Sequence, residues 1–242
     1  MNNSPNEAVS LAQNIQALIQ SSPDVLNKAE FLVCPSHVHL MSVASTLREG
    51  DVSLGAQDCS FDDNGAHTGD VSVTMLGEVG CSMVVLGHSE RRQNHKEESV
   101  VVAKKAAKAH SQGLVTIICV GETLDEREAG KALDVVCAQL EKSIPHSSNS
   151  ENLLIAYEPV WAIGTGKVAS PEDVENMHLG IASFLKEKLD NGHLIRILYG
   201  GSVKPENARA LSQIEHVGGF LIGGASLKAE SFVGIAQEIE GV

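Results

Sequence analysis

The chain has 242 residues, of which 43% are hydrophobic and 20% are charged, proportions that fit a folded globular protein and exclude disordered and fibrous classes. Its formal net charge of -13 disfavours nucleic acids and anionic membrane surfaces as partners, because both are bound through Lys and Arg. The length suffices for one α/β barrel or for two smaller domains.

The chain opens with a predicted helix, which a capping box at Ser4-Pro5-Asn6-Glu7 announces and apolar residues at helical spacing continue. Short apolar runs then predict seven strands, at residues 30–34, 52–56, 83–86, 114–119, 153–157, 195–199 and 219–222. Helical periodicity lies between them, at 101–110, 131–141, 171–189 and 227–239. Such alternation indicates parallel strands with helices outside them.

The pattern favours a single α/β domain over residues 1–242, because no Pro/Gly/Ser-rich linker or composition shift divides the chain. A closed (β/α)8 barrel has eight strands, and seven open strands would leave two edges with unpaired backbone groups. We therefore expect a barrel whose first strand is missing before residue 1. Periodicity alone also allows a doubly wound open sheet.

The third predicted strand runs into polar residues that a core strand does not need, at Gly87-His88-Ser89-Glu90-Arg91-Arg92. Barrel active sites form at the carboxyl ends of the strands, so His88 is a candidate catalytic residue. A helix dipole favours the neutral form of a His at a helix N-terminus, and that form can donate a hydrogen bond to a carbonyl group. A structural histidine is an equally good reading of this segment alone.

The fifth predicted strand ends in a carboxylate, Glu158, which is followed by Pro159, an apolar tip at 161–163 and two glycines, Gly164 and Gly166. Pro and Gly are suitable hinges, so we expect the tip to form a lid that covers a ligand and excludes water. A carboxylate desolvated under such a lid is a stronger base. An ordinary turn in which Glu158 caps a helix is the alternative.

The last two predicted strands end in glycine pairs, Gly200-Gly201 beside Ser202 and Gly223-Gly224 beside Ala225. Glycine lets backbone N–H groups come close to an anion, and the N-terminus of a following helix adds further N–H groups. Phosphate sites of barrels commonly form at these last strands. The two segments together predict a phosphate site.

Metal and nucleophilic chemistry are disfavoured. His37-Val38-His39 is similar to the HxH pair of metal-dependent barrel hydrolases, but an i, i+2 spacing on a predicted helix points the two rings to different faces. No complementary Asp/His set stands at other strand ends, and no GxSxG motif occurs. We therefore expect no metal.

The cysteines and the N-terminus point to the cytoplasm. Five cysteines without a CxxC pair read as reduced thiols, at Cys34, Cys59, Cys81, Cys119 and Cys137. The first residues, MNNSPNEA, lack the apolar region of a signal peptide, and no apolar run is long enough to cross a bilayer. We expect a cytoplasmic protein without a membrane partner.

Four motifs together resemble the signatures of the triosephosphate isomerase family, in the order and spacing of that family. They are GHSERR at residues 87–92, AYEPVWAIGTGK at 156–167, YGGSV at 199–203 and GGASL at 223–227. The resemblance covers nearly the whole chain. It implies a TIM barrel that interconverts dihydroxyacetone phosphate and glyceraldehyde 3-phosphate without a cofactor.

The resemblance also implies roles for individual residues. Glu158 would be the base that moves a proton between neighbouring carbons, and His88 would be the neutral electrophile that polarises the carbonyl group. A homodimer would form through the loop from Gln57 to Asp70. The phosphate would be bound by the backbone amides of Gly164, Ser202, Gly223 and Gly224.

At its N-terminus the chain differs from the family that it resembles. The family begins with a strand ending NWKMN, of which this chain holds Met1-Asn2, so the substrate-binding Asn and the catalytic Lys are absent. Glu90, which pairs with that Lys in the family, is expected to turn to Arg91 or Arg92 or to take up a proton. Losing one preorganised donor typically costs on the order of a hundredfold in rate. Two readings remain open: an isomerase whose chain starts further upstream, and a catalytically impaired barrel that binds phosphorylated ligands.

Overall fold

The structure is a computed structural model that describes residues 1–162 and 169–239. The strands of these ranges are β1 (Phe31–Val33), β2 (Val52–Ala56), β3 (Met83–Leu86), β4 (Val115–Val120), β5 (Leu153–Tyr157) and β6 (Ile197–Tyr199). The α-helices are α1 (Pro5–Ser21), α2 (Leu40–Leu47), α3 (Val73–Val79), α4 (Ser89–Asn94), α5 (Ser99–Ser111), α6 (Leu124–Glu128), α7 (Ala132–Ser143), α8 (Pro171–Lys188), α9 (Pro205–Ser212) and α10 (Ala229–Glu238). Short 3-10 helices are η1 (Pro23–Asn27), η2 (His37–His39), η3 (Val160–Ala162), η4 (Gly192–Leu194) and η5 (Gly224–Leu227).

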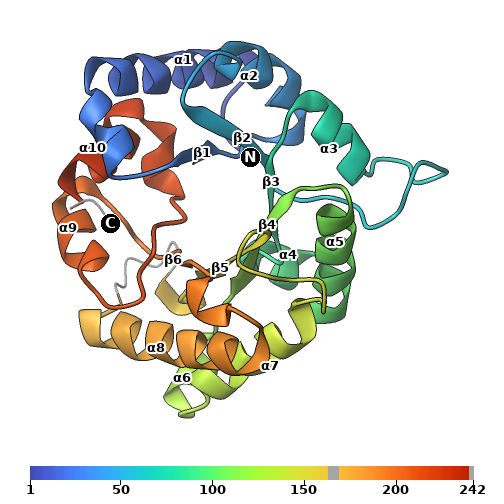
Figure 1. Cartoon of the computed structure of the whole chain (residues 1–242), viewed down its shortest axis with the longest axis vertical. Helices are drawn as coiled ribbons and strands as arrows, with labels where there is room; N and C mark the ends of the chain where they lie inside the picture. The colour runs from blue at the N-terminus through green and yellow to red at the C-terminus, as the bar shows by residue number, and fades with distance from the viewer. Residues whose placement is uncertain (163–168, 240–242) are drawn as a thin grey trace.

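The six strands form one parallel sheet in the order β1-β2-β3-β4-β5-β6. The longest pairing joins β4 to β5, from Thr116 opposite Leu153 to Val120 opposite Tyr157. Figure 1 shows this sheet curled around a central axis, with the long helices outside it. A curled sheet with helices on its outer face is a barrel arrangement of the TIM type, so the predicted fold class is confirmed and the open doubly wound sheet is excluded.

The seventh predicted strand, at residues 219–222, is reduced to an isolated bridge between Tyr199 and Phe220. The N–H group of Tyr199 donates to the carbonyl of Gly219, and that of Leu221 donates to the carbonyl of Tyr199. Gly219 has a φ of +149°, which breaks the regular extended conformation at the start of the segment. Within the described residues, the sheet is therefore open between β1 and the Phe220 segment.

Two apolar layers follow from the alternation of side chains across the strands. The larger core lies between the sheet and the helices, and it includes Val84, Leu86 and Ile118. The smaller cluster lies inside the curled sheet, and its buried members are Val85, Ile117, Cys119, Leu154, Ala156 and Leu198. In the part of the chain that the structure describes, no helix is both long and apolar enough to cross a membrane.

The first helix, α1, shows the predicted capping box. The side chain of Ser4 accepts from the N–H of Glu7, and the carboxylate of Glu7 accepts from the N–H of Ser4. The helix buries Ala8, Ala12, Ile15 and Ile19 on one face. It packs against α2 on one side and α10 on the other, so the ring of helices continues across the opening in the sheet (Figure 1).

A long loop connects β2 to α3 and projects away from the barrel wall (Figure 1). A bridge between Ser60 and Ser72 closes its base, where the N–H group of Ser60 donates to the carbonyl of Val71 at 2.8 Å. Residues 63–70 between these points are mostly exposed. The side chain of Asp58, at the start of the loop, points back toward α4 and α5.

Candidate active site

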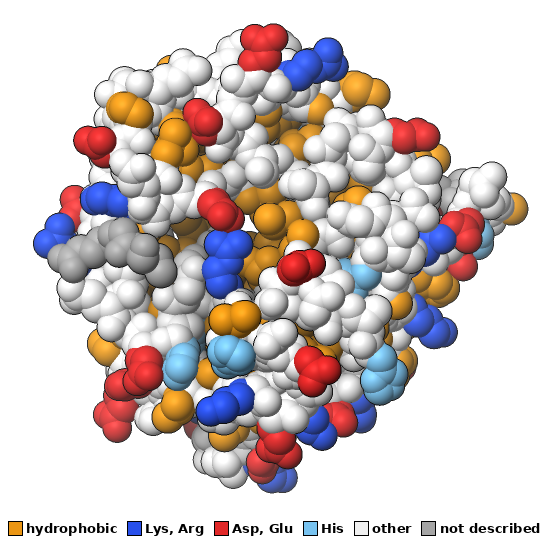
Figure 2. Space-filling model, viewed as in Figure 1, with side chains coloured by type: hydrophobic (Ala, Val, Ile, Leu, Met, Phe, Trp, Pro, Cys, Tyr) orange, Lys and Arg blue, Asp and Glu red, His pale blue; other side chains and the backbone are white. Residues whose placement is uncertain are grey.

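The predicted site residues lie around one large cavity of about 2020 Å³ inside the curled sheet. Its apolar wall includes Leu32, Met83 and Ile117, and its far side opens between β1 and the Phe220 segment. Figure 2 shows the hollow, with apolar side chains on its floor and charged side chains of both signs around its rim. The predicted site residues that line it are His88, Glu90, Glu158, Ser202, Gly223 and Gly224. Gly164 lies outside the described residues.

Glu158 follows directly on β5 and is almost completely buried, with 2% of its surface exposed. Its Oε1 atom lies 2.9 Å from Nε2 of His88, and its Oε2 atom accepts from the N–H group of Ser89 at 3.0 Å. A buried carboxylate normally needs such partners, because an unpaired charge is strongly disfavoured away from water. Both oxygens of the candidate base therefore have a partner within the protein.

The backbone around Glu158 is held by β4 and by the side chain of Gln139 on α7. The N–H group of Glu158 donates to the carbonyl of Val120 at 2.8 Å. The side-chain amide of Gln139 binds both the N–H and the carbonyl of Gly121, each at 2.9 Å. A Cβ atom on Gly121 would lie 1.8 Å from the carbonyl oxygen of Glu158, so only glycine allows this close approach.

His88 is the N-cap of α4, and its Nδ1 atom accepts from the N–H group of Glu90 at 3.3 Å. This contact leaves the ring proton on Nε2, where it points at Glu158. Burial lowers the pKa of His88, while its hydrogen bond and charge contact with Glu158 raise it, and the net pKa lies above its ordinary value. The raised pKa therefore depends on Glu158 staying in place.

Among the described residues Glu90 forms no ion pair with Arg91 or Arg92, so the expectation that it turns to one of them is wrong. Its carboxylate lies 4.0 Å from Nδ1 of His88, and 75% of the side chain is exposed. Arg91 instead binds Asp58 at 2.9 Å and Glu97 at 3.3 Å. The sequence does not reveal this choice, because the partners of Arg91 stand on other elements.

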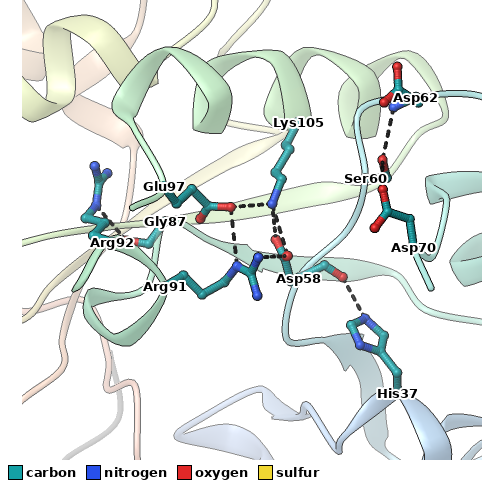
Figure 3. Close-up of polar contacts among 10 residues, drawn as sticks. All are labelled: His37, Asp58, Ser60, Asp62, Asp70, Gly87, Arg91, Arg92, Glu97 and Lys105. Carbon is teal, nitrogen blue, oxygen red and sulfur yellow. Dashed lines mark hydrogen bonds and ion pairs between the residues drawn. The ribbon is translucent and has the colours of Figure 1, made fainter. Parts of the chain in front are cut away.

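Arg91 belongs to a cluster of two cations and two carboxylates that Figure 3 shows beside α4. Lys105, on α5, binds both Asp58 and Glu97. Burial raises the pKa of Glu97, but its bonds from Lys105 and Arg91 outweigh that effect and hold the pKa below its ordinary value. The cluster fixes the start of the β2–α3 loop to the helix that carries His88, and sequence inspection did not identify it.

The glycine-rich strand ends present backbone donors to the same cavity. Among the described residues, the N–H groups of Ser202, Gly223 and Gly224 have no hydrogen-bond acceptor. A Cβ atom on Gly223 or Gly224 would meet nothing within 4 Å, so the space beside both is open. Free N–H groups at the edge of a cavity are suited to an anion.

Glu122 is a further residue that sequence reasoning missed. It follows β4, is completely buried, and its Oε1 atom accepts from the hydroxyl of Tyr157 at 3.1 Å and from Nε1 of Trp161 at 2.7 Å. Arg127 completes the group with a bond to the same oxygen at 3.2 Å. This network holds Trp161, the first residue of the predicted lid. A carboxylate two residues after an apolar run was the available signal.

The two histidines of the HxH pair bind separate backbone carbonyls. Nε2 of His37 contacts the carbonyl of Asp58 at 2.8 Å, and Nε2 of His39 contacts that of Asn3 at 3.1 Å. Both therefore tie neighbouring segments to η2. The described residues contain no group of three or more potential metal ligands.

Comparison with known proteins gives a consistent result. A family model described as triosephosphate isomerase matches residues 1–239. A triosephosphate isomerase of Bradyrhizobium sp. (strain ORS 278) is 48% identical over 228 residues, which cover 93% of this chain and 91% of the relative. One from Bartonella bacilliformis is 49% identical over 209 residues, covering 86% and 82%. The crystal structure of triosephosphate isomerase from Bartonella henselae superposes with a TM-score of 0.89 at 43% identity, covering 98% of this chain and 94% of that one.

Proposed function

We propose that Glu158 and His88 carry the proton transfers in this chain. The chain belongs to the triosephosphate isomerase family and interconverts dihydroxyacetone phosphate and glyceraldehyde 3-phosphate through an enediolate. The reaction moves a proton between neighbouring carbons, so it needs a base near the carbons and a donor near the carbonyl oxygen. The observation that supports this assignment is the 2.9 Å contact between the two side chains at the edge of the cavity.

Glu158 is the proposed base. Both of its oxygens are bound within the protein, one by His88 and the other by the N–H group of Ser89. To take a proton from carbon, the carboxylate must release at least one of them and turn toward the substrate. Burial favours this chemistry, because a carboxylate without its polar partners is a stronger base in a site from which water is excluded.

His88 is the proposed hydrogen-bond donor to the carbonyl oxygen. When Glu158 turns to the substrate, its own hydrogen bond and charge contact, which raise the pKa of His88, are lost, whereas burial, the N–H group of Glu90 and the pKa-raising charge of the Glu90 carboxylate remain. Burial, the largest influence on this pKa, favours the neutral ring, and the N–H group of Glu90 keeps the ring proton on Nε2. The same movement thus frees the donor and sets its protonation state.

The substrate is a triose phosphate, and we propose that its phosphate group is bound by the backbone N–H groups of Ser202, Gly223 and Gly224. Backbone donors explain how a chain with a net charge of -13 can hold an anion. Gly164, outside the described residues, is proposed as a fourth donor from the lid.

We further propose that the chain forms a homodimer through the loop from Gln57 to Asp70. The loop projects from the barrel and is longer than a simple strand-to-helix connection. Two apolar residues, Phe61 on the loop and Met75 just beyond it, are 37% and 54% exposed. Exposed apolar side chains on a projecting loop favour docking against a second copy.

The cytoplasm is the proposed compartment. All five cysteines are free thiols. Burial raises the pKa of Cys34 to about 12 and that of Cys81 to about 11, so both stay protonated and unreactive at neutral pH. Such thiols suit a reducing environment.

The test is a coupled assay with glyceraldehyde 3-phosphate on the intact chain, on Glu158→Gln and on a control, Glu175→Gln, whose side chain is exposed on α8. We expect turnover by the intact chain and the control, and a loss of kcat in Glu158→Gln that far exceeds any loss of affinity for a phosphorylated enediolate mimic in calorimetry. Unchanged turnover in Glu158→Gln would remove Glu158 from its role.

A further inference from the structure

The side chain of Arg92 joins four segments behind the catalytic pair. From α4 its Nε atom donates to the carbonyl of Gly87 at 2.7 Å, a bond that Figure 3 shows. One terminal nitrogen donates to the hydroxyl of Ser99 at 2.9 Å. The other donates to the carbonyl of Cys119 at 3.1 Å and to the hydroxyl of Ser143 at 3.2 Å.

All four acceptors are uncharged, which is unusual for a half-buried guanidinium. Arg91, the next residue along the chain, binds two carboxylates, but Arg92 has no carboxylate within ion-pair distance among the described residues. Burying a cation without an ion-pair partner is costly, so the position indicates a purpose other than stability. The more distant carboxylates of Glu97 and Glu158 partly offset the lowering of the Arg92 pKa by burial.

Two of the four acceptors belong to the backbone that places the catalytic side chains. Gly87 immediately precedes His88 and has a left-handed φ of +67°. A Cβ atom there would lie 2.9 Å from a terminal nitrogen of Arg92, so the guanidinium packs directly on this turn. Cys119 precedes Val120, whose carbonyl accepts from the N–H group of Glu158. The rigid, planar guanidinium of Arg92 therefore links the segment that precedes His88 to the segment that binds the backbone of Glu158.

We propose that Arg92 is a positioning residue, which sets the separation of His88 and Glu158 through its bonds to the carbonyls of Gly87 and Cys119. The inference rests on the catalytic roles proposed above. The planar fork of arginine suits this task, because its donors keep fixed directions, whereas lysine offers one point charge on a flexible stem. Ser99 and Ser143 accept further hydrogen bonds from the guanidinium, but neither belongs to the backbone next to His88 or Glu158.

The experiment measures kcat and KM for Arg92→Met, which removes the fork, and for Arg92→Lys, which keeps the charge. We expect kcat to fall in the order wild type, Lys, Met, and to be about 10- to 100-fold lower for Met, because small misplacements of reacting groups cost that much. KM should stay within about threefold of wild type, because the proposed phosphate donors lie elsewhere. Activities are normalised to the folded fraction from circular dichroism.

Ser99→Ala is the matched control. It removes one bond to the same guanidinium but leaves those to Gly87 and Cys119, so stability should fall slightly and kcat should stay at the wild-type value. If Arg92→Met does not fold, Arg92→Lys decides by the same kcat and KM values. Wild-type kcat in the folded arginine variants, or equal changes in kcat for Arg92→Lys and Ser99→Ala, would overturn the proposal.

Glu158→Gln separates this inference from the function on which it rests. If Glu158→Gln keeps its turnover, the proposed catalytic pair is wrong, and the role of Arg92 falls with it. If Glu158→Gln loses turnover while the folded arginine variants keep theirs, the pair stands and only the positioning role of Arg92 is wrong.

Discussion

The ammonium group of Lys105 donates to both carboxylate oxygens of Asp58, at 2.7 and 3.0 Å, although the two residues lie 47 positions apart (Figure 3). Lys105 is 6% exposed and also binds Glu97. Its loss would leave the nearby Arg91 to balance two carboxylates. The main effect of losing Lys105 would therefore be negative charge on Asp58 and Glu97 that is left buried without enough positive charge beside it.

Lys105→Met should destabilise the protein by about 3–5 kcal/mol, because breaking a buried ion pair strands the remaining charges. The free energy of unfolding can be measured by urea denaturation at neutral pH. Lys104→Met is the control, because Lys104 is exposed on the same helix and lies over the ring of Phe61, a contact worth less than about 1 kcal/mol at an exposed site. Similar values for the two variants would show that the cluster is not structural.

His88→Gln should lower kcat less than Glu158→Gln does, because an amide can still donate a hydrogen bond to the carbonyl oxygen but a Gln in place of Glu158 cannot accept the proton. Steady-state kinetics with glyceraldehyde 3-phosphate gives both values. Melting temperatures of the two variants supply the control. Equal losses of stability and of kcat in both would favour a structural reading of His88.

The buried His178 should make the fold sensitive to acid. Burial lowers its pKa to about 4, from an ordinary value of 6.5, and its Nδ1 atom contacts the carbonyl of His216 at 3.0 Å. The unfolded chain binds this proton at higher pH than the folded chain, so stability present above pH 6.5 is lost as the pH falls toward 4. At about 1.4 kcal/mol per pKa unit, the loss reaches about 3 kcal/mol.

His178→Asn tests this, because an amide donates near the position of Nδ1 and cannot take up a proton in this range. Urea denaturation at pH 7 and at pH 4.5 should show a smaller loss of stability in the variant than in the wild type. His193→Asn changes an exposed histidine and should keep the wild-type loss. An unchanged loss in His178→Asn would assign the acid sensitivity to other groups.

The proposed dimer can be tested by sedimentation at micromolar concentration. We expect the wild type to sediment as a dimer and Met75→Asp to shift toward monomer, because a charge would be placed in a desolvated contact. Leu194→Asp is the control, since Leu194 is similarly exposed, at 58%, and belongs to η4 rather than to the loop or α3. A monomeric wild type at this concentration would refute the assignment.

Much of the fold could be predicted from the sequence because apolar runs and helical periodicity are local signals. The helix cap at Ser4 and the strands from β1 to β6 follow from such patterns. The segment at Phe220 could not be foreseen as a single bridge, because the positive φ of Gly219 and its one-sided pairing depend on neighbours distant in sequence. A run of apolar residues indicates that a segment is buried, but it does not indicate whether the segment pairs with strands on both of its sides.

The site shows the same limit. His88 and Glu158 could be proposed as site residues because each is an ionisable group at the end of an apolar run. The clamp of Gln139 on Gly121 and the contacts of Arg92 could not, because their acceptors are mostly backbone carbonyls, which every residue carries. Sequence patterns identify unusual side chains, whereas the groups that orient them bind ordinary backbone atoms.

The opening between β1 and the Phe220 segment predicts a gain in stability from an added strand. We expect that extending the chain before Met1 with a β-branched strand would raise the melting temperature, because β1 would gain a second hydrogen-bonded neighbour and the apolar wall of the cavity would be covered. A Gly/Ser extension of the same length is the control. Equal melting temperatures for the two extensions would show that the added strand does not pair.

The packing of α1 against α10 determines where the native protein opens first. β4 is hydrogen-bonded on both sides, by β3 and β5, whereas within the described ranges β1 pairs with β2 alone. Across the opening in the sheet, the helical layer is joined by the contact of α1 with α10. Local unfolding there breaks no strand ladder, so its free energy is lower than that of opening β4. We therefore expect amide hydrogens of β1 to exchange with solvent before those of β4, so that the barrel would loosen from the ends of the chain inward.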